Sequence, residues 1–141
     1  MKLQLKNITP EAFGPYGAVL DFPPEKPGGF HIIVRDEGPG WRLAVLGTKN
    51  HSMARMENHP TSQESFEPLT GMGVLVVAEN GSPERYEAFL LDKPVCLFKG
   101  IWHEFFALSA EASVKIAENL EVTSEYYHLP KPLTVFVGEE G

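Results

Sequence analysis

The sequence predicts an all-β protein, either a sandwich or a barrel, and three observations support this prediction. Short runs of β-branched and aromatic residues recur along the chain. Clusters of Gly, Pro, Asn and Asp separate these runs at short intervals, which is typical of strands joined by turns. No long segment shows the 3.6-residue periodicity of an amphipathic helix.

One short helix is expected near the N-terminus. Thr9 suits the N-cap, Pro10 suits the first helical position, and Glu11 places an acid in the first turn. Gly14 and Pro15 follow almost at once, so the helix is expected to end within about one turn.

The rest of the chain is predicted as strands and connections. The expected strands are residues 18–21, 30–35, 41–47, 52–57, 73–79, 85–91, 95–98, 105–108, 113–118 and 132–137. Pro130 and Pro132 indicate that the last of these is an edge strand. Residues 121–127 are predicted to form a short helix or an irregular turn. The Pro- and Gly-rich residues 22–29 form either a surface connection, the commoner role, or a lid over a site.

Length and composition restrict the class of protein. A chain of 141 residues is expected to form one domain over residues 1–141. Its net charge of −7 argues against nucleic-acid and anionic-membrane partners, which need basic clusters. The N-terminus lacks a secretory apolar segment, and the longest apolar run, residues 72–78, is shorter than the roughly 20 residues of a bilayer span. Cys96, the only cysteine, is expected to be a small buried side chain, which fits a reducing, cytoplasmic setting.

Glu57 and His59 are the first candidates for chemistry. Side chains alternate along a strand, so these two residues are expected on one face. Pro60 favours an extended conformation at His59 and so helps to fix its direction. An unpaired carboxylate inside a barrel is costly, and Glu57 must therefore face solvent or have a ligand.

Gln63 and His103 are expected to complete a four-residue cradle. Gly100 permits a tight turn, and Trp102 would pack on the opposite face, so His103 would point inward. Gln63 and Glu64 compete for the third position in the cradle, and the prediction assigns it to Gln63. The acid and histidines expected outside the site are Glu104, His31, His51 and His128.

The cradle could hold a divalent metal or bind an acidic substrate. Two histidines, His59 and His103, with the oxygen donors Glu57 and Gln63 suit Zn, Ni, Mn or Fe. The cations available for a substrate carboxylate are Arg35, Arg42, Arg55 and Lys99. Arg55 is two residues from Glu57, so it is expected on the same face of the strand and is the first choice. Lys99 is the second predicted substrate-binding residue.

These motifs resemble two related protein families. Glu57-x-His59-x3-Gln63, followed by Gly71, resembles the first cupin motif, in which His-x-His precedes Glu after a gap of three or four residues. Gly100-x-x-His103 resembles the end of the second cupin motif. The chain more closely resembles the ureidoglycolate lyase family, through Glu57-x-His59-Pro60, Gln63, Phe66-x-Pro68, Gly71, Trp102-His103 and the early Phe13-x-x-Tyr16-Gly17.

The resemblance implies a fold and an activity. It implies a cupin-like double-stranded β-helix, or jelly-roll barrel, that forms a homodimer. Members of the family release urea and glyoxylate from ureidoglycolate, a small acidic substrate, late in purine (allantoin) catabolism. The implied site residues are Glu57, His59, Gln63 and His103. The chain departs from the family pattern at two places: Glu104-Phe105 stands where the family carries His-Pro, and Glu118-Asn119 stands where it tends to carry an acid followed by Arg.

Three functions therefore remain open from the sequence. The first is a ureidoglycolate lyase-like enzyme, acting on ureidoglycolate or a related small carbinolamide acid. His59 or His103 would be the base and Glu57 its partner or the acid. The second is a noncatalytic cupin that binds a small acidic metabolite. The third is another metal-dependent cupin enzyme, such as a sugar isomerase or a dioxygenase.

Overall fold

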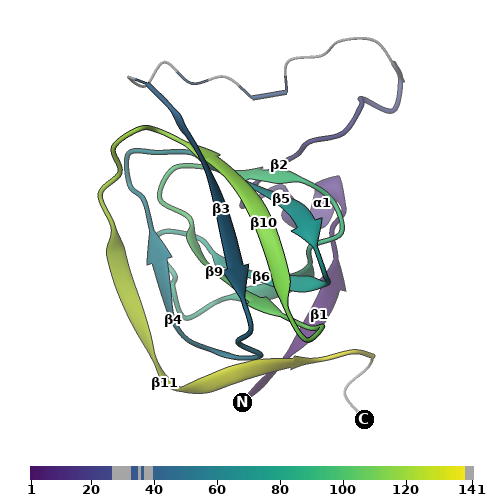
Figure 1. The fold of residues 1–141 in the computed structure, drawn as a ribbon, viewed down its shortest axis with the longest axis vertical. Helices are drawn as coiled ribbons and strands as arrows, with labels where there is room; N and C mark the ends of the chain where they lie inside the picture. Colours follow the sequence, from purple (N-terminus) through teal and green to yellow (C-terminus); the bar gives the residue numbers. More distant parts are fainter. Residues whose placement is uncertain (27–32, 35, 37–39, 139–141) are drawn as a thin grey trace.

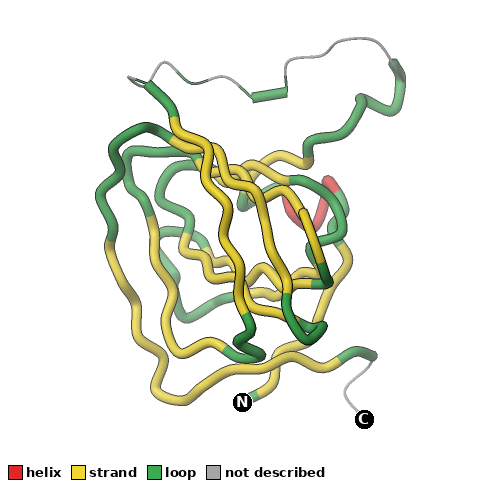
Figure 2. The backbone as a smooth tube through the Cα atoms, in the orientation of Figure 1, coloured by secondary structure: helices red, strands yellow, loops and turns green. Residues whose placement is uncertain are grey.

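The computed structural model describes residues 1–26, 33–34, 36 and 40–138, and these are mostly strands (Figures 1 and 2). The prediction of an all-β, cupin-like jelly roll is confirmed. Most of the strand predicted at residues 30–35 lies outside the described residues, as does the end of the loop at residues 22–29.

Six strands hydrogen-bond into a closed ring, in the order β1-β11-β4-β9-β6-β7. Their bounds are β1 (Lys2–Asn7), β4 (Met53–Asn58), β6 (Gly73–Ala78), β7 (Glu87–Leu90), β9 (Trp102–Ala107) and β11 (Glu125–Phe136). β1 closes the ring because it pairs in parallel with both β11 and β7, whereas the other pairs are antiparallel.

The remaining strands form a second, five-stranded sheet in the order β2-β8-β5-β10-β3. Their bounds are β2 (Gly17–Val19), β3 (Arg42–Thr48), β5 (Glu64–Thr70), β8 (Val95–Leu97) and β10 (Ala112–Glu118). β10 pairs over its whole length with β3, which lies at the front of Figure 1.

Alternation along the ring strands produces two hydrophobic cores. In β6, Val74 and Val76 point into the ring, while Leu75 and Val77 point toward the five-stranded sheet. The ring core comprises Met53, Met56, Val74, Val76, Ala78, Ala88, Trp102, Phe106 and Leu133. The inter-sheet core includes Phe13, Phe66, Leu75, Val77, Phe89, Val95, Phe105 and Val114. Because both faces of β6 are buried, its sequence is a continuous apolar run.

The N-terminal helix forms as predicted. Helix α1 (Pro10–Phe13) begins after Thr9, whose Oγ1 accepts a hydrogen bond from the Ala12 backbone N–H at 3.0 Å. Phe13 anchors the helix in the inter-sheet core, where its ring packs edge-on against Phe89.

Several strand predictions need correction. Of the two alternatives for residues 121–127, the helix is wrong: residues 121–124 are irregular, and β11 begins at Glu125, where it pairs with β4. Strands β1 and β5 were not predicted at all. β5 contains Pro68, which weakens its strand signal, whereas β1 carries a short polar–apolar alternation, Lys2-Leu3-Gln4-Leu5-Lys6, that the prediction overlooked.

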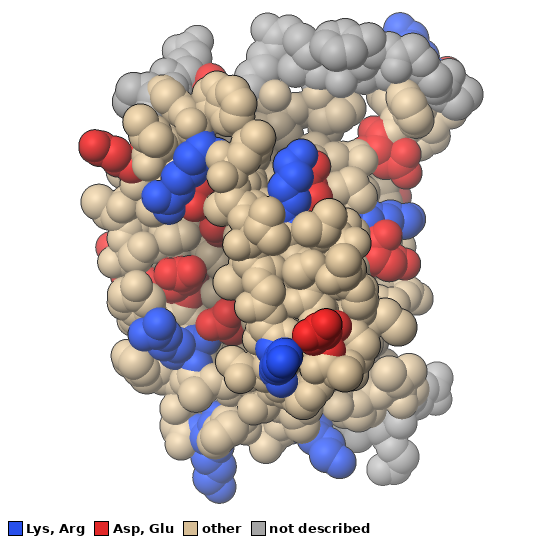
Figure 3. Space-filling view, viewed as in Figure 1, with Lys and Arg blue, Asp and Glu red and all other residues tan. Residues whose placement is uncertain are grey.

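The charged side chains on one face of the molecule and the length of its helices can be described directly. On the face shown in Figure 3, Lys and Arg side chains are scattered among Asp and Glu rather than gathered into a basic patch. No helix among the described residues is long and apolar enough to cross a membrane.

Candidate active site

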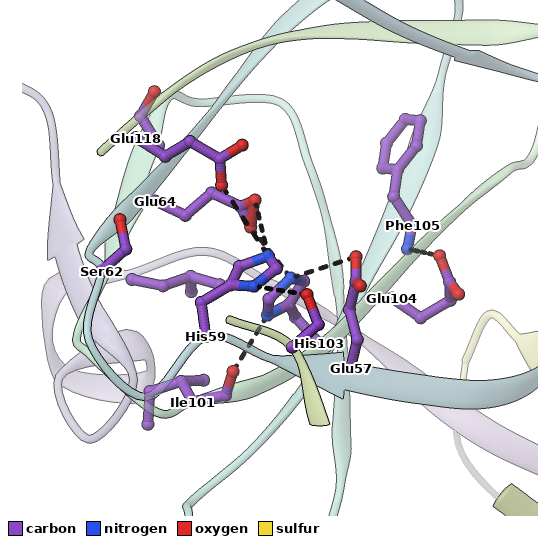
Figure 4. A network of polar contacts seen from close by, with 12 residues as sticks. Glu57, His59, Ser62, Glu64, Ile101, His103, Glu104, Phe105 and Glu118 are labelled. Carbon is purple, nitrogen blue, oxygen red and sulfur yellow. Dashed lines mark hydrogen bonds and ion pairs between the residues drawn. The ribbon is translucent and has the colours of Figure 1, made fainter. Parts of the chain in front are cut away.

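A group of polar side chains lies between the two sheets, next to the inter-sheet core (Figure 4). Two cross-strand pairs build most of it. On the ring, Glu57 of β4 lies opposite His103 of β9. On the five-stranded sheet, Glu64 of β5 lies opposite Glu118 of β10. Cross-strand partners share a face, so the two pairs point toward each other across the interior.

His59 follows β4 and is fixed from several sides. Its Nδ1 is 3.1 Å from the Thr123 carbonyl oxygen and 3.2 Å from the Ser124 hydroxyl. A carbonyl can only accept, so Nδ1 carries the proton and Nε2 faces the site. The Gly100 backbone N–H donates to the His59 carbonyl at 3.0 Å, which ties this residue to the turn before His103.

His103 is oriented in the same way. Its Nδ1 donates to the Ile101 carbonyl at 2.9 Å, and its Nε2 points at the acids. Gly100 adopts a positive φ of 78°, which allows the tight turn that the sequence predicted before this strand. Trp102 points to the opposite face and joins the ring core, again as predicted.

Glu64 lies between the two imidazoles. Its Oε1 is 2.9 Å from Nε2 of His103, and its Oε2 is 3.5 Å from Nε2 of His59. Glu57 approaches His103 from the other side, with Oε1 3.9 Å from Nε2. The side chains of Glu64, His59 and His103 are nearly fully buried, whereas that of Glu57 is 37% exposed. Solvent therefore reaches this acid more readily than the imidazoles.

The Glu64 carboxylate controls the charge of both histidines. Burial opposes protonation of His59, but its interaction with Glu64 outweighs burial and raises the pKa to about 9. Burial likewise disfavours the charged form of His103, yet the charge of Glu64 raises its pKa above the ordinary value. Burial alone would raise the pKa of Glu64, but the charges and hydrogen bonds of His103 and His59 hold it well below its usual range.

Glu118 connects the site to an arginine. Its Oε1 is 3.7 Å from Nε2 of His59, and its Oε2 accepts hydrogen bonds from Nε and Nη2 of Arg42 at 2.9 and 2.8 Å. Burial and the charge of Glu64 raise the pKa of Glu118, although Arg42 opposes this shift.

The donor set fits a divalent metal ion. Nε2 of His103 and Oε1 of Glu64 are buried 2.9 Å apart, and the buried Oε1 of Glu118 is 3.7 Å from Nε2 of His59, so these atoms point at one another inside the group. Two groups bring their ligand atoms within 4.8 Å of one another: Glu57, His59 and His103, and His59, Glu64 and Glu118. Imidazole and carboxylate donors suit Zn, Ni, Mn or Fe.

Metal affinity is expected to rise with pH. A metal must displace the proton on Nε2 of His59, whose pKa is about 9. Below that pH the proton competes, and the raised pKa of His103 adds a second proton, so affinity for Mn²⁺ should increase by about tenfold or more per pH unit between pH 7 and 9. Calorimetric titration across this range tests the expectation, and an affinity that is flat or falls with pH contradicts it.

The structure brings together three of the four predicted site residues and places Glu64 where Gln63 was expected. Gln63 Oε1 faces the Cys96 sulfur at 3.7 Å, whereas Glu64 lies between the histidines. The sequence held a signal for this assignment: four residues separate His59 from Glu64, within the gap that the cupin pattern allows. Glu118 was not assigned to the site, because no local pattern links it to the histidine motifs, and Arg42 was one of four candidate cations, of which Arg55 was preferred.

The two predicted substrate-binding cations lie apart from this group. The Arg55 guanidinium stacks over the Tyr126 ring at 4.5 Å and lines a cleft of about 420 Å³ between β3, β4 and β9. Lys99 forms an ion pair with Asp36 at 3.3 Å. Glu104 is outside the histidine group, as expected, and accepts a hydrogen bond from the Phe105 backbone N–H.

The fold and these side chains define a cupin-like jelly roll with an interior site of histidines and carboxylates. The chain belongs to the ureidoglycolate lyase family. It is 31% identical to a ureidoglycolate lyase of Rhodobacter capsulatus, over 95% of this chain and 98% of the relative. It is also 31% identical to the Agrobacterium fabrum ureidoglycolate lyase, over 72% of this chain and 74% of the relative.

Two further comparisons add little. No protein-family model matches the chain. Among solved structures, it is similar to a dTDP sugar isomerase from Desulfovibrio desulfuricans, with a TM-score of 0.47 and 15% identity over 82% of each chain. That similarity is too distant to carry an argument about function.

Proposed function

We propose that this protein is a ureidoglycolate lyase that releases urea and glyoxylate from ureidoglycolate. The observation that carries the proposal is the buried Glu64 carboxylate between Nε2 of His59 and Nε2 of His103, in a chain of this family. Such an arrangement holds acid and base groups of different charge within one small space, as general acid–base catalysis requires.

The reaction requires one proton to leave the substrate and one to return. As the C–N bond breaks, the carbinol hydroxyl loses its proton to become the aldehyde of glyoxylate, and the urea nitrogen gains one. Glu57 is the more exposed carboxylate and is positioned to accept the hydroxyl proton. His59, with a pKa of about 9, is protonated at neutral pH and can donate to the leaving nitrogen.

A divalent metal would be held by His59, His103 and the neighbouring carboxylates of Glu57 or Glu64. When bound, it would supply Lewis-acid polarisation of the substrate oxygens. The histidines would then act as ligands rather than as proton donors, while Glu57, if it is not itself a ligand, would keep its role near the entrance. The carbonyl partners of both Nδ1 atoms hold the imidazoles in the orientation that either role needs.

A direct assay tests the proposal. Purified protein, alone and with added Mn²⁺, Ni²⁺ or Zn²⁺, should release urea and glyoxylate in equal amounts from ureidoglycolate. His103→Ala should lower kcat/KM by about 100-fold or more. His51→Ala is the matched control, because His51 also contacts a backbone carbonyl, that of Ala107, but lies outside the site. If wild-type protein releases neither product under any of these conditions, the proposal fails.

The second candidate function is a noncatalytic binder of small acidic metabolites, and like the lyase it requires the interior site to open. The cavity lined by His59, Glu64 and His103 has an empty volume of only about 140 Å³, so a substrate or metabolite could enter only after side chains move. Stabilisation by small carboxylates without turnover would favour this alternative. Stoichiometric metal with activity on another substrate class would instead favour a different cupin enzyme. A homodimer remains a prediction, which light scattering can test.

A further inference from the structure

Arg42 connects the buried acids to solvent. It begins β3 and lies directly opposite Glu118 of β10, so both side chains share the face that looks toward the histidines. The Glu118 side chain is 7% exposed and that of Arg42 is 43% exposed. The guanidinium therefore reaches from the acid cluster to the surface.

The hydrogen bonds of Arg42 leave it able to bind a second anion. Nε and Nη2 both donate to the same oxygen, Oε2 of Glu118. In the described part of the chain, Nη1 donates to no side chain or backbone oxygen. A guanidinium carries five N–H donors, so a carboxylate can bind beside Glu118 without displacing it.

A cation beside this group would favour the binding of an acidic ligand. Three carboxylates, Glu57, Glu64 and Glu118, surround the two histidines, so an approaching anion meets more acids than imidazoles. Of the arginines and lysines that the structure describes, Arg42 is the one whose guanidinium bonds to an acid of this cluster. Arg55 is two residues from Glu57 but stacks on Tyr126.

We propose that Arg42 is the specificity-determining residue of the site and binds the carboxylate of the substrate. This inference rests on the proposed function for the identity of that substrate, since ureidoglycolate carries one carboxylate. In this inference, Arg42 on the edge strand β3 recognises the charge of the substrate. The histidines and acids in or next to β4, β5 and β9 act on the rest of the substrate.

Binding of two matched probes tests the proposal without requiring turnover. Glycolate carries a carboxylate, and glycolamide has the same shape without the charge. Arg42→Met should weaken glycolate binding by about 10- to 100-fold and leave glycolamide binding within about twofold. Arg42→Lys keeps the charge but loses the planar fork, so its loss for glycolate should be intermediate. For ureidoglycolate, Arg42→Met should raise KM far more than it lowers kcat.

Lys115→Met is the matched control. Lys115 of β10 pairs with Glu67 of β5 at 3.6 Å, on the face of the sheet opposite that of Glu118, and its side chain is 47% exposed. This variant should leave both probes unaffected. A parallel Arg55→Met variant tests the competing anchor.

The outcomes separate this inference from the proposed function. If Arg42→Met weakens both probes equally or neither, or if Arg55→Met alone removes the preference for glycolate, the inference is overturned. If wild-type protein fails to turn over ureidoglycolate yet prefers glycolate through Arg42, the proposed function fails and the carboxylate subsite stands.

Discussion

Replacing Glu64 with glutamine is expected to lower kcat for ureidoglycolate by about 100- to 10,000-fold. The Glu64 carboxylate lies 2.9 Å from one histidine and 3.5 Å from the other. Its interaction with His59 keeps that imidazole protonated well above neutral pH. A neutral amide of the same size would remove this charge, and burial would then lower the pKa of His59 and of His103.

The adjacent residue supplies a stringent control. Gln63→Ala removes a side chain whose amide oxygen faces the Cys96 sulfur rather than the histidines, so kcat should stay within about threefold of wild type. The two variants differ by one position in the chain, yet the structure places only Glu64 between the imidazoles. Comparable losses of kcat in both variants, with both proteins folded, would contradict this assignment.

The predicted placement of Glu57 and His103 depends on local patterns. Alternation along β4 and the turn at Gly100 are properties of a few neighbouring residues, so Glu57 and His103 could be placed on facing positions. The choice between Gln63 and Glu64 depends instead on where β5 begins and which face it presents. Pairing of Glu64 with Glu118, 54 positions along the chain, fixes that face.

The same difference between local patterns and long-range strand pairing explains which elements of the fold were predicted. The Thr9 cap and the valine-rich β6 have strong local signals, and both were predicted. β11 was missed in part because its first residues pair with β4 and its last with β1, across an irregular stretch near Pro130 and Pro132. A sequence pattern cannot show such a change of partner, because the hydrogen bonds involve strands far away in the chain.

Truncation of Leu75 to alanine should cost about 2–5 kcal/mol of unfolding free energy, a large share of the roughly 5–15 kcal/mol that stabilises a typical domain. Leu75 is fully buried at the centre of β6, which pairs on one side with Phe89 of β7 and on the other with Phe105 of β9. Neighbours held in two ladders cannot easily collapse into the vacated space, so most of the cavity would remain.

The matched change Leu43→Ala should cost less than about 1 kcal/mol. Leu43 is 57% exposed on the edge strand β3, which has β10 as its partner on one side. Urea unfolding of both variants, followed by fluorescence of the two tryptophans, compares their midpoints at unchanged slope. Equal losses would mean that the interior of the inter-sheet core is less tightly packed than its burial indicates, and that the histidines beside it lack the rigid support that the site requires.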